Sequence, residues 1–354
     1  VHRAANLLLS DCADFGISQL KAKMGRGDYP LRQGYFLKDA FLNTPAVILG
    51  AGPSLKKELD TLFSMQDKAL IFSGGSALAA LPFEPHFAAH IDLKFPYHEA
   101  KRSSFWETPF LFQSRVNPAH FSFIHGEAVL FPETHHNFLN WIDGIDEPFD
   151  GGWTVGTFLT QIARFLGCNP IILVGMDLCY VEGKKYLHRP NDPFPQGFDE
   201  EKMTQHDWIM AREWLETLSL QNPKHRWIDV RGVGAPLAGL FEQIPLASLQ
   251  MEKREDLRKQ VFEKIQGLPF LSSHHARWQE WGHSLLRCQQ SLSSLQGIAE
   301  VKEEVAYDLL LAPLWKIFSP LFERETKGVG EIELHRFIFF QRVIQEHLHA
   351  MELS

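Results

Sequence analysis

Short apolar segments alternate with amphipathic helical segments between Pro45 and about Leu249. The apolar segments are only four or five residues long, which is typical of buried strands in a parallel sheet. The segments between them repeat apolar residues every three or four positions, the spacing of one helix face. This alternation predicts a Rossmann-like α/β domain with a mostly parallel sheet flanked by helices. Strands are predicted at 46–49, 69–72, 87–91, 110–113, 128–131, 171–174 and 227–230.

The two ends of the chain have different patterns. Residues 1–44 are predicted to form a flank of helix and loop, because Gly25, Gly27, Pro30 and Gly34 interrupt any regular period. Residues 250–354 carry long helical patterns without strand segments, so we expect a helical C-terminal region of four or five helices. The predicted divisions are therefore 1–44, 45–249 and 250–354.

The first strand of the central part leads into a turn of small residues. Gly50-Ala51-Gly52 follows it, and Pro53 and Ser54 come next. Glycines allow a tight turn and a close approach of the backbone to a ligand. A helix is expected at once, with Pro53 in its first turn and Ser54 as its cap. Such a strand, turn and helix make an anion site, whereas the incomplete glycine fingerprint leaves a plain structural turn as the alternative.

Other small or acidic residues follow predicted strands in the same way. Ser76 ends the turn after 69–72, Thr154 ends the turn 151–154 that opens a helix, and Asp92 and Asp177 follow the strands 87–91 and 171–174. The carboxyl ends of parallel strands meet at one edge of a sheet, where α/β proteins bind ligands. We therefore expect these four residues to lie near the glycine turn.

Composition narrows the class of partner. The net charge of −8, with lysines and arginines scattered, argues against a basic nucleic-acid-binding face and favours small-molecule or protein partners. Cys12, Cys168, Cys179 and Cys288 form no C-x-x-C pair, so we expect no disulfide framework or cysteine zinc site and a reducing, cytoplasmic location. Prolines and a lysine interrupt the longest apolar segment, 309–322, so no membrane span is expected.

Four blocks of the sequence together resemble the MptE-like family: GAGPSL at 50–55, HIDLK at 90–94, the glycine-rich block 151–180, and RGVGAPLAG at 231–239. That family includes the bacterial motility accessory factors, called Maf, and an archaeal 6-hydroxymethylpterin diphosphokinase. Maf proteins are implicated in adding nonulosonic acids to flagellin. The resemblance covers about 45–249 and implies a Rossmann-like domain that handles a nucleotide or nucleotide-sugar.

The first block and the block 151–180 are also similar to those of bacterial sialyltransferases that use CMP-activated sugars. This similarity implies a nucleotide site in which Ser76 approaches the nucleotide or its sugar and Thr154 and Gly156 bond the phosphate. One departure is Ala51, which stands where those enzymes have an asparagine. The implied nucleotide-binding residues are Gly50, Ala51, Gly52, Pro53, Ser54, Ser76, Thr154 and Gly156.

Glycosyl transfer from a CMP-nonulosonic acid to a protein or glycan hydroxyl is the first functional hypothesis. His188 is the first candidate for the base that takes the acceptor proton, before His206 and His90. Tyr180 and Tyr186 are candidate donors to the phosphate. An acceptor protein such as flagellin is the expected partner, no tightly bound cofactor is expected, and the oligomeric state is left open.

Two alternatives stay open. Asp92 and Asp177 would hold Mg²⁺ against ATP if the chain resembles the diphosphokinase, and they would then serve the transfer of a diphosphoryl group to a pterin-like hydroxymethyl group. Aspartates at strand ends also cap helices or hold loops. The third hypothesis is a non-catalytic nucleotide-binding scaffold, because a fold alone does not decide function.

Overall fold

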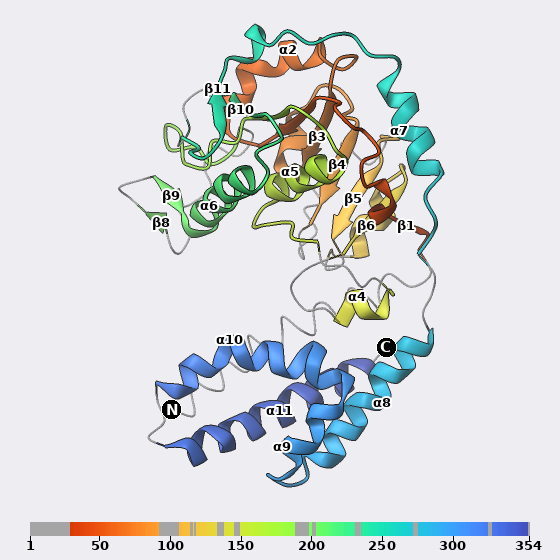
Figure 1. The fold of residues 1–354 in the computed structure, drawn as a ribbon, viewed down its shortest axis with the longest axis vertical. Helices are drawn as coiled ribbons and strands as arrows, with labels where there is room; N and C mark the ends of the chain where they lie inside the picture. Colours follow the sequence, from red (N-terminus) through yellow and green to blue (C-terminus); the bar gives the residue numbers. More distant parts are fainter. Residues whose placement is uncertain are drawn as a thin grey trace.

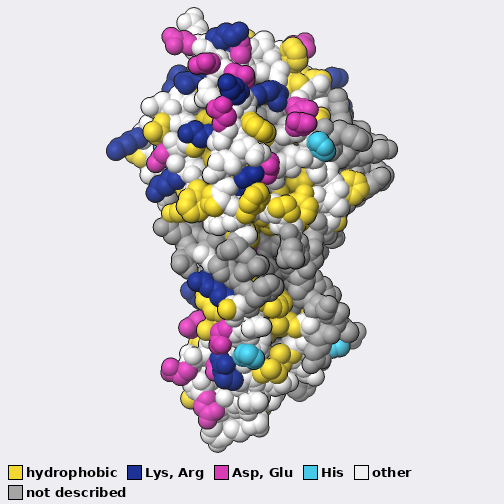
Figure 2. Space-filling view, turned by 90° about the vertical axis from the view of Figure 1, so that its right-hand side faces the viewer, with side chains coloured by type: hydrophobic (Ala, Val, Ile, Leu, Met, Phe, Trp, Pro, Cys, Tyr) yellow, Lys and Arg dark blue, Asp and Glu magenta, His cyan; other side chains and the backbone are white. Residues whose placement is uncertain are grey.

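The protein consists of a larger lobe built on a sheet and a smaller lobe built of helices (Figure 1). The computed structural model describes residues 29–91, 106–113, 116, 118–132, 138–144, 149–187, 198–199, 203–230, 234, 236–271, 275–324 and 328–352. On the face in Figure 2, acidic and basic side chains are interspersed over the larger lobe, so neither sign of charge dominates that face.

Nine of the described strands form one sheet in which every neighbouring pair is parallel. Their order is β1-β6-β5-β4-β3-β2-β7-β10-β11. The seven predicted strands are confirmed within one or two residues, and their side chains are buried. The strands are β1 Leu31–Gln33, β2 Ala46–Leu49, β3 Leu70–Gly74, β4 Phe87–His90, β5 Phe110–Gln113, β6 Ala128–Phe131, β7 Ile171–Val174, β10 Trp227–Val230 and β11 Phe241–Gln243. A separate two-stranded sheet pairs β8 Phe198–Asp199 with β9 Thr204–Gln205.

The chain changes direction across the sheet between β2 and β7. From β2 it adds β3, β4, β5 and β6 successively on one side, and it then returns to place β7, β10 and β11 on the other side of β2. In open parallel sheets a crevice forms at the carboxyl ends of the strands where the order reverses in this way. The fold therefore places a crevice after Leu49 and Val174.

Helix α5 Val155–Phe165 packs across β2, β3, β4 and β7. It ends beside the segment that leads into the amino end of β2. Gly167 follows its last turn with a φ of +79°, the left-handed conformation typical of a glycine at a helix C-terminus. The carbonyl groups of residues 165–167 accept the N–H groups of Asp39, Phe41 and Asn43 at 3.0, 2.8 and 2.9 Å. The last carbonyls of α5 are thereby satisfied by another segment, which fixes the helix along its axis.

The remaining helices of the larger lobe flank the sheet. Short 3₁₀ helices at Gly34–Leu37, Pro53–Glu58, Gly75–Ala80, Pro118–Phe123 and Leu246–Ser248 follow or join the strands. The α-helices are α2 Leu59–Phe63, α6 His206–Gln221 and α7 Leu257–Gln266. The helix predicted after Gly52 thus begins as a 3₁₀ helix and continues as α2.

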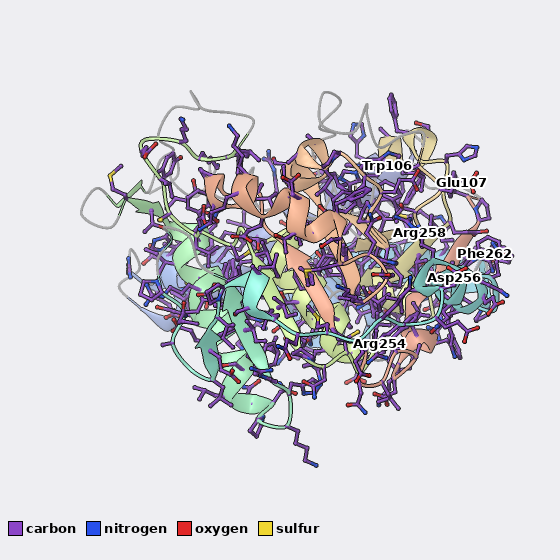
Figure 3. The ribbon with its side chains drawn as sticks, turned by 90° about the horizontal axis from the view of Figure 1, so that it is seen from above. Trp106, Glu107, Arg254, Asp256, Arg258 and Phe262 are labelled. Atoms are coloured by element: carbon purple, nitrogen blue, oxygen red, sulfur yellow. The ribbon has the colours of Figure 1, made fainter. Side chains whose placement is uncertain are left out.

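Both predicted flanks contribute to the sheet lobe. β1, from the N-terminal flank, pairs with β6, and α7, from the C-terminal region, buries Leu257, Val261 and Ile265 in the core beside the sheet. Arg258 of α7 donates to the carbonyl of Glu84, just before β4. Figure 3 shows Arg258 and Phe262 on the same side of the molecule as Trp106 and Glu107, which precede β5.

The smaller lobe has its own apolar core, formed by α8 His275–Ser291, α9 Gly297–Glu300, α10 Ala312–Glu323 and α11 Val329–Glu352. A 3₁₀ turn at Val301–Glu303 and a π turn at Tyr307–Leu311 connect them. Helix α4 Phe138–Ile142, which follows β6 in the chain, also joins this core: Phe138 stacks on Trp281 with ring centroids 4.9 Å apart. The two lobes are therefore linked by packing as well as by the chain that enters α8.

Among the described helices, none is by itself long and apolar enough to cross a membrane. The segments Gly297–Glu303 and Tyr307–Glu323 reach that length and composition only together, and they are bent by 99° at their junction.

We predict that the smaller lobe loses stability in mild acid because of His347. This side chain is fully buried in α11, and burial lowers its pKa to about 4 from an ordinary value near 6.5. Between these two pH values the unfolded chain binds a proton that the folded chain does not. The free energy of unfolding should therefore fall by about 1.4 kcal/mol per pH unit as the pH drops from 6.5 to 4.

The measurement is urea unfolding of the wild type and the His347→Leu variant at several pH values, with the smaller lobe followed separately where two transitions occur. The variant should show a shallower pH dependence. Equal slopes in both proteins would contradict the prediction.

Candidate functional site

A pocket of about 200 Å³ opens at the carboxyl ends of β2 and β7, where the strand order reverses. Its walls come from the turns after β2, β3 and β7, from the start of α5, and from the segment after Asp177 together with the start of α6. The lining residues are Leu49, Gly50, Ala51, Gly52, Gly74, Gly75, Ser76, Ile91, Trp153, Thr154, Val155, Gly156, Gly175, Met176, Asp177, Leu178, Cys179, Lys185, Tyr186, Asp207 and Trp208.

The floor of the pocket is a close contact between two backbone turns. A Cβ atom on Gly50 would overlap the carbonyl of Gly175, and Gly175 itself has a φ of +68°. The N–H groups of Gly50 and Gly52 donate to the carbonyls of Val174 and Gly175 at 2.8 and 2.9 Å. These two amides therefore join β2 to β7, and they are not free to bind an anion as the sequence suggested.

Asp177 fixes the turn from the side of β7. It is only 5% exposed, and its Oδ2 accepts the Ser54 N–H at 3.0 Å while its Oδ1 accepts the Ser54 hydroxyl. The prediction that Ser54 caps its own helix is wrong, because the cap position is Gly52 and the carboxylate of Asp177 takes the Ser54 amide instead. A Cβ atom on Gly52 would overlap that carboxylate, so only glycine fits there.

The first turn of α5 supplies the donors that the glycine turn lacks. Thr154 is its N-cap: Thr154 Oγ1 accepts the Thr157 N–H at 3.2 Å, and Thr157 Oγ1 accepts the Thr154 N–H at 2.9 Å. The N–H groups of Val155 and Gly156 lie in the first turn, where a helix provides no acceptor of its own. Both residues line the pocket, so the positive end of the helix dipole lies at its wall.

One wall of the pocket is aromatic and carries a cation. Trp208 of α6 is 7% exposed, and Tyr186 packs edge-on against it with ring centroids 6.3 Å apart. Lys185 Nζ lies 5.1 Å from the ring centre of Tyr186 and 5.6 Å from that of Trp208. Lys185 therefore adds positive charge to the same pocket that the first turn of α5 lines.

The structure brings most of the expected residues together. Of the predicted nucleotide-binding set, Gly50, Ala51, Gly52, Ser76, Thr154 and Gly156 line the pocket, as do Asp177 and Tyr186. Pro53 and Ser54 follow the glycine turn in the chain and are not part of the pocket lining. Tyr180 is buried in the core against Trp208, with ring centroids 5.4 Å apart, and it does not reach the pocket wall. His188 and Asp92 lie outside the described residues.

The other two histidine candidates are not in the pocket lining. His90 is 1% exposed between Phe110 and His120, and burial, together with His120, lowers its pKa to about 3. A base with so low a pKa stays neutral but is weak near neutral pH. His206 is exposed at the first position of α6, beside the pocket-lining Asp207.

A magnesium site is not assembled by the described residues alone. Among them, no group of three or more histidine, cysteine, aspartate or glutamate side chains is placed to hold a metal ion. Asp177 is the described half of the predicted Asp92–Asp177 pair, and both of its oxygens already accept hydrogen bonds from Ser54. Its geometry fits the structural role of holding a turn.

Comparison with known proteins agrees with this architecture. Residues 29–183 match the family described as 6-hydroxymethylpterin diphosphokinase MptE-like. This region of the chain is MptE-like. The MptE-like region runs from just before β1 to just after β7, so it contains the glycine turn, α5 and Asp177 but not α6 or the helices α8 to α11. The family resemblance expected from the sequence is thereby confirmed.

A solved structure shares the fold over nearly the whole chain. The MAf glycosyltransferase from Magnetospirillum magneticum AMB-1 superposes with a TM-score of 0.63 and 16% sequence identity. The superposition covers 96% of the present chain and 55% of the other, so the chain spans about half of that protein. Comparison by sequence with curated proteins gave no match.

Several pocket residues were not found by sequence reasoning. Trp153, Met176 and Cys179 line the pocket, and a Cβ atom on Gly156 would lie 2.7 Å from the sulfur of Met176. Trp153 and Met176 each follow a glycine, Cys179 lies two residues after Asp177, and none of the three belongs to a periodic pattern. Their proximity in sequence to the glycine turns was the one signal available.

We predict that the Ser54–Asp177 contact supports the pocket. Ser54→Ala removes a hydroxyl that donates to a buried carboxylate, so the free energy of unfolding should fall by about 1–3 kcal/mol. Ser64→Ala is the matched control, because the Ser64 hydroxyl donates to the carbonyl of Thr61 at an exposed position. The control should change stability by less than about 0.5 kcal/mol in urea unfolding. Equal losses in the two variants would show that the Asp177 contact adds no stability.

Proposed function

We propose that the chain is a glycosyltransferase that takes a nonulosonic acid from a CMP-activated donor and transfers it to a hydroxyl group of a protein or glycan. The observation that carries the proposal is the pocket at the reversal point of the sheet, whose lining includes both the glycine turn and the first turn of α5. A phosphate group suits this position because it accepts several N–H groups and is negatively charged. Lys185 adds a cation to the pocket lining, beside Tyr186 and Trp208.

The proposed reaction needs little more than positioning and proton transfer. The acceptor oxygen attacks the anomeric carbon, the bond from that carbon to the phosphate oxygen breaks, and CMP leaves with the electron pair. The first-turn amides of α5 and Lys185 stabilise the charge that develops on the phosphate. The acceptor proton passes to a base, for which His188 stays the candidate.

Two features support the assignment of His188. The Leu187 N–H donates to the carbonyl of Ala51 at 2.9 Å, so the residue before His188 in the sequence is tied to the glycine turn. A histidine has an ordinary pKa near neutrality, which suits a general base. The MAf neighbour is a glycosyltransferase by its own description, and the fold it shares with this chain is compatible with the proposal.

The second candidate is Mg²⁺-ATP-dependent transfer of a diphosphoryl group to a pterin-like hydroxymethyl group, favoured by the family description of the MptE-like region. The engagement of both Asp177 oxygens by Ser54 counts against it. Flagellin or another surface protein as acceptor, the cytoplasm as location and a non-catalytic scaffold role stay proposals of lower rank. None of them follows from the pocket.

The test is thermal unfolding with CMP, CDP, UDP and ATP, each with and without Mg²⁺, because a ligand that binds the folded state raises the unfolding temperature. CMP should stabilise the protein without metal. Ala51→Phe places a ring in the pocket and should abolish the shift, whereas Ala276→Phe, an exposed position on α8, should preserve it. Stabilisation by ATP that requires Mg²⁺ would replace the proposal with the diphosphokinase, and no stabilisation by any nucleotide would leave the scaffold.

A further inference from the structure

Trp153 is a large apolar side chain left open to solvent at the pocket. It is 51% exposed, whereas the neighbouring Trp208 is 7% exposed. Both rings line the pocket, but Trp208 is covered by Tyr186 and Tyr180 and belongs to the core. Trp153 is therefore the most exposed aromatic side chain in this lining.

The segment that carries Trp153 is held on both sides. Before it, Asp150 Oδ2 accepts the Trp214 Nε1–H at 2.8 Å and Asp150 Oδ1 accepts the Gly152 N–H at 2.9 Å. Gly152 has a φ of +66°, and a Cβ atom there would lie 2.9 Å from the Trp214 ring. These hydrogen bonds and the close packing hold the backbone before Trp153 in place.

The segment is equally fixed on the α5 side. Thr157 Oγ1 donates to the Gly151 carbonyl at 2.9 Å, and Thr157 also forms the capping box with Thr154. The position of Trp153 relative to the first turn of α5 is therefore set before any ligand binds. An exposed tryptophan on a rigid segment binds a flat ring at little entropic cost.

We infer that Trp153 stacks against the base of a nucleotide whose phosphate lies at the first turn of α5. Trp153 directly precedes the N-cap Thr154. It is therefore two and three residues away in sequence from Val155 and Gly156, whose amides lie in the first turn. A nucleotide likewise joins a flat base to a phosphate through one sugar. The inference rests on the proposed nucleotide site and adds the group that recognises the base.

The experiment measures the affinities of CMP and ATP by titration calorimetry for the wild type and for the Trp153→Phe and Trp153→Leu variants. Trp153→Leu keeps an apolar side chain but loses the aromatic face, so the affinity of the bound nucleotide should fall about tenfold. Trp153→Phe should stay within about threefold of the wild type. Phe36→Leu likewise replaces an exposed aromatic side chain with leucine, at a 61% exposed position outside the pocket lining, and should have no effect.

Ribose 5-phosphate, measured by its displacement of the nucleotide, separates the base from the rest of the ligand. Its affinity should be the same in the wild type and in Trp153→Leu, and an equal loss for both ligands would overturn stacking on the base. Nucleotide binding that Trp153→Leu leaves unchanged would overturn the inference but not the proposed site. If the wild type binds neither CMP nor ATP, both the inference and the proposed nucleotide site are overturned. If it binds ATP but not CMP, only the proposal of a CMP-activated donor is overturned.

Discussion

The contact between Gly50 and Gly175 is the constraint on which the pocket depends. The turns that follow β2 and β7 approach so closely that a side chain on Gly50 would overlap the carbonyl of Gly175. Two backbone hydrogen bonds, from Gly50 to Val174 and from Gly52 to Gly175, extend the pairing of β2 with β7 beyond the last strand residues. These contacts close the bottom of the crevice predicted by the strand order. A ligand can therefore enter only the space above the two turns.

This constraint also explains the division of roles between the two strand-to-helix turns. The turn after β2 uses its amides to hold β7, and its Ser54 to bind Asp177. The start of α5 is capped through side chains, by Thr154 and Thr157, and keeps the first-turn amides of Val155 and Gly156 for another partner. One turn builds the floor and the other offers the donors, although both are rich in glycine and look alike in sequence.

The buried central strands could be predicted from the sequence, whereas the two edge strands of the sheet could not. Strands such as Ile171–Val174 are continuous apolar segments, because both faces of a parallel sheet are covered, and so they were predicted. β1 and β11 are three residues long and contain the sequences LRQ and FEQ, which show no apolar period. They are strands because a neighbour pairs with them. In the same way, α7 was predicted as a helix, but its packing beside the sheet depends on contacts far apart in the chain.

The site follows the same physical division. That several turns meet at one edge follows from parallel strands, so Gly50, Ser76, Thr154 and Asp177 were correctly placed together. Which amides are used and which are free depends on hydrogen bonds between segments more than 100 residues apart, such as Ser54 to Asp177. No local pattern encodes these contacts. The MptE-like region contains the floor of the pocket and the first turn of α5, whereas Asp207 and Trp208 of α6 lie beyond it. The family match therefore extends over the part of the pocket that the parallel strands build, and the wall from α6 lies outside it.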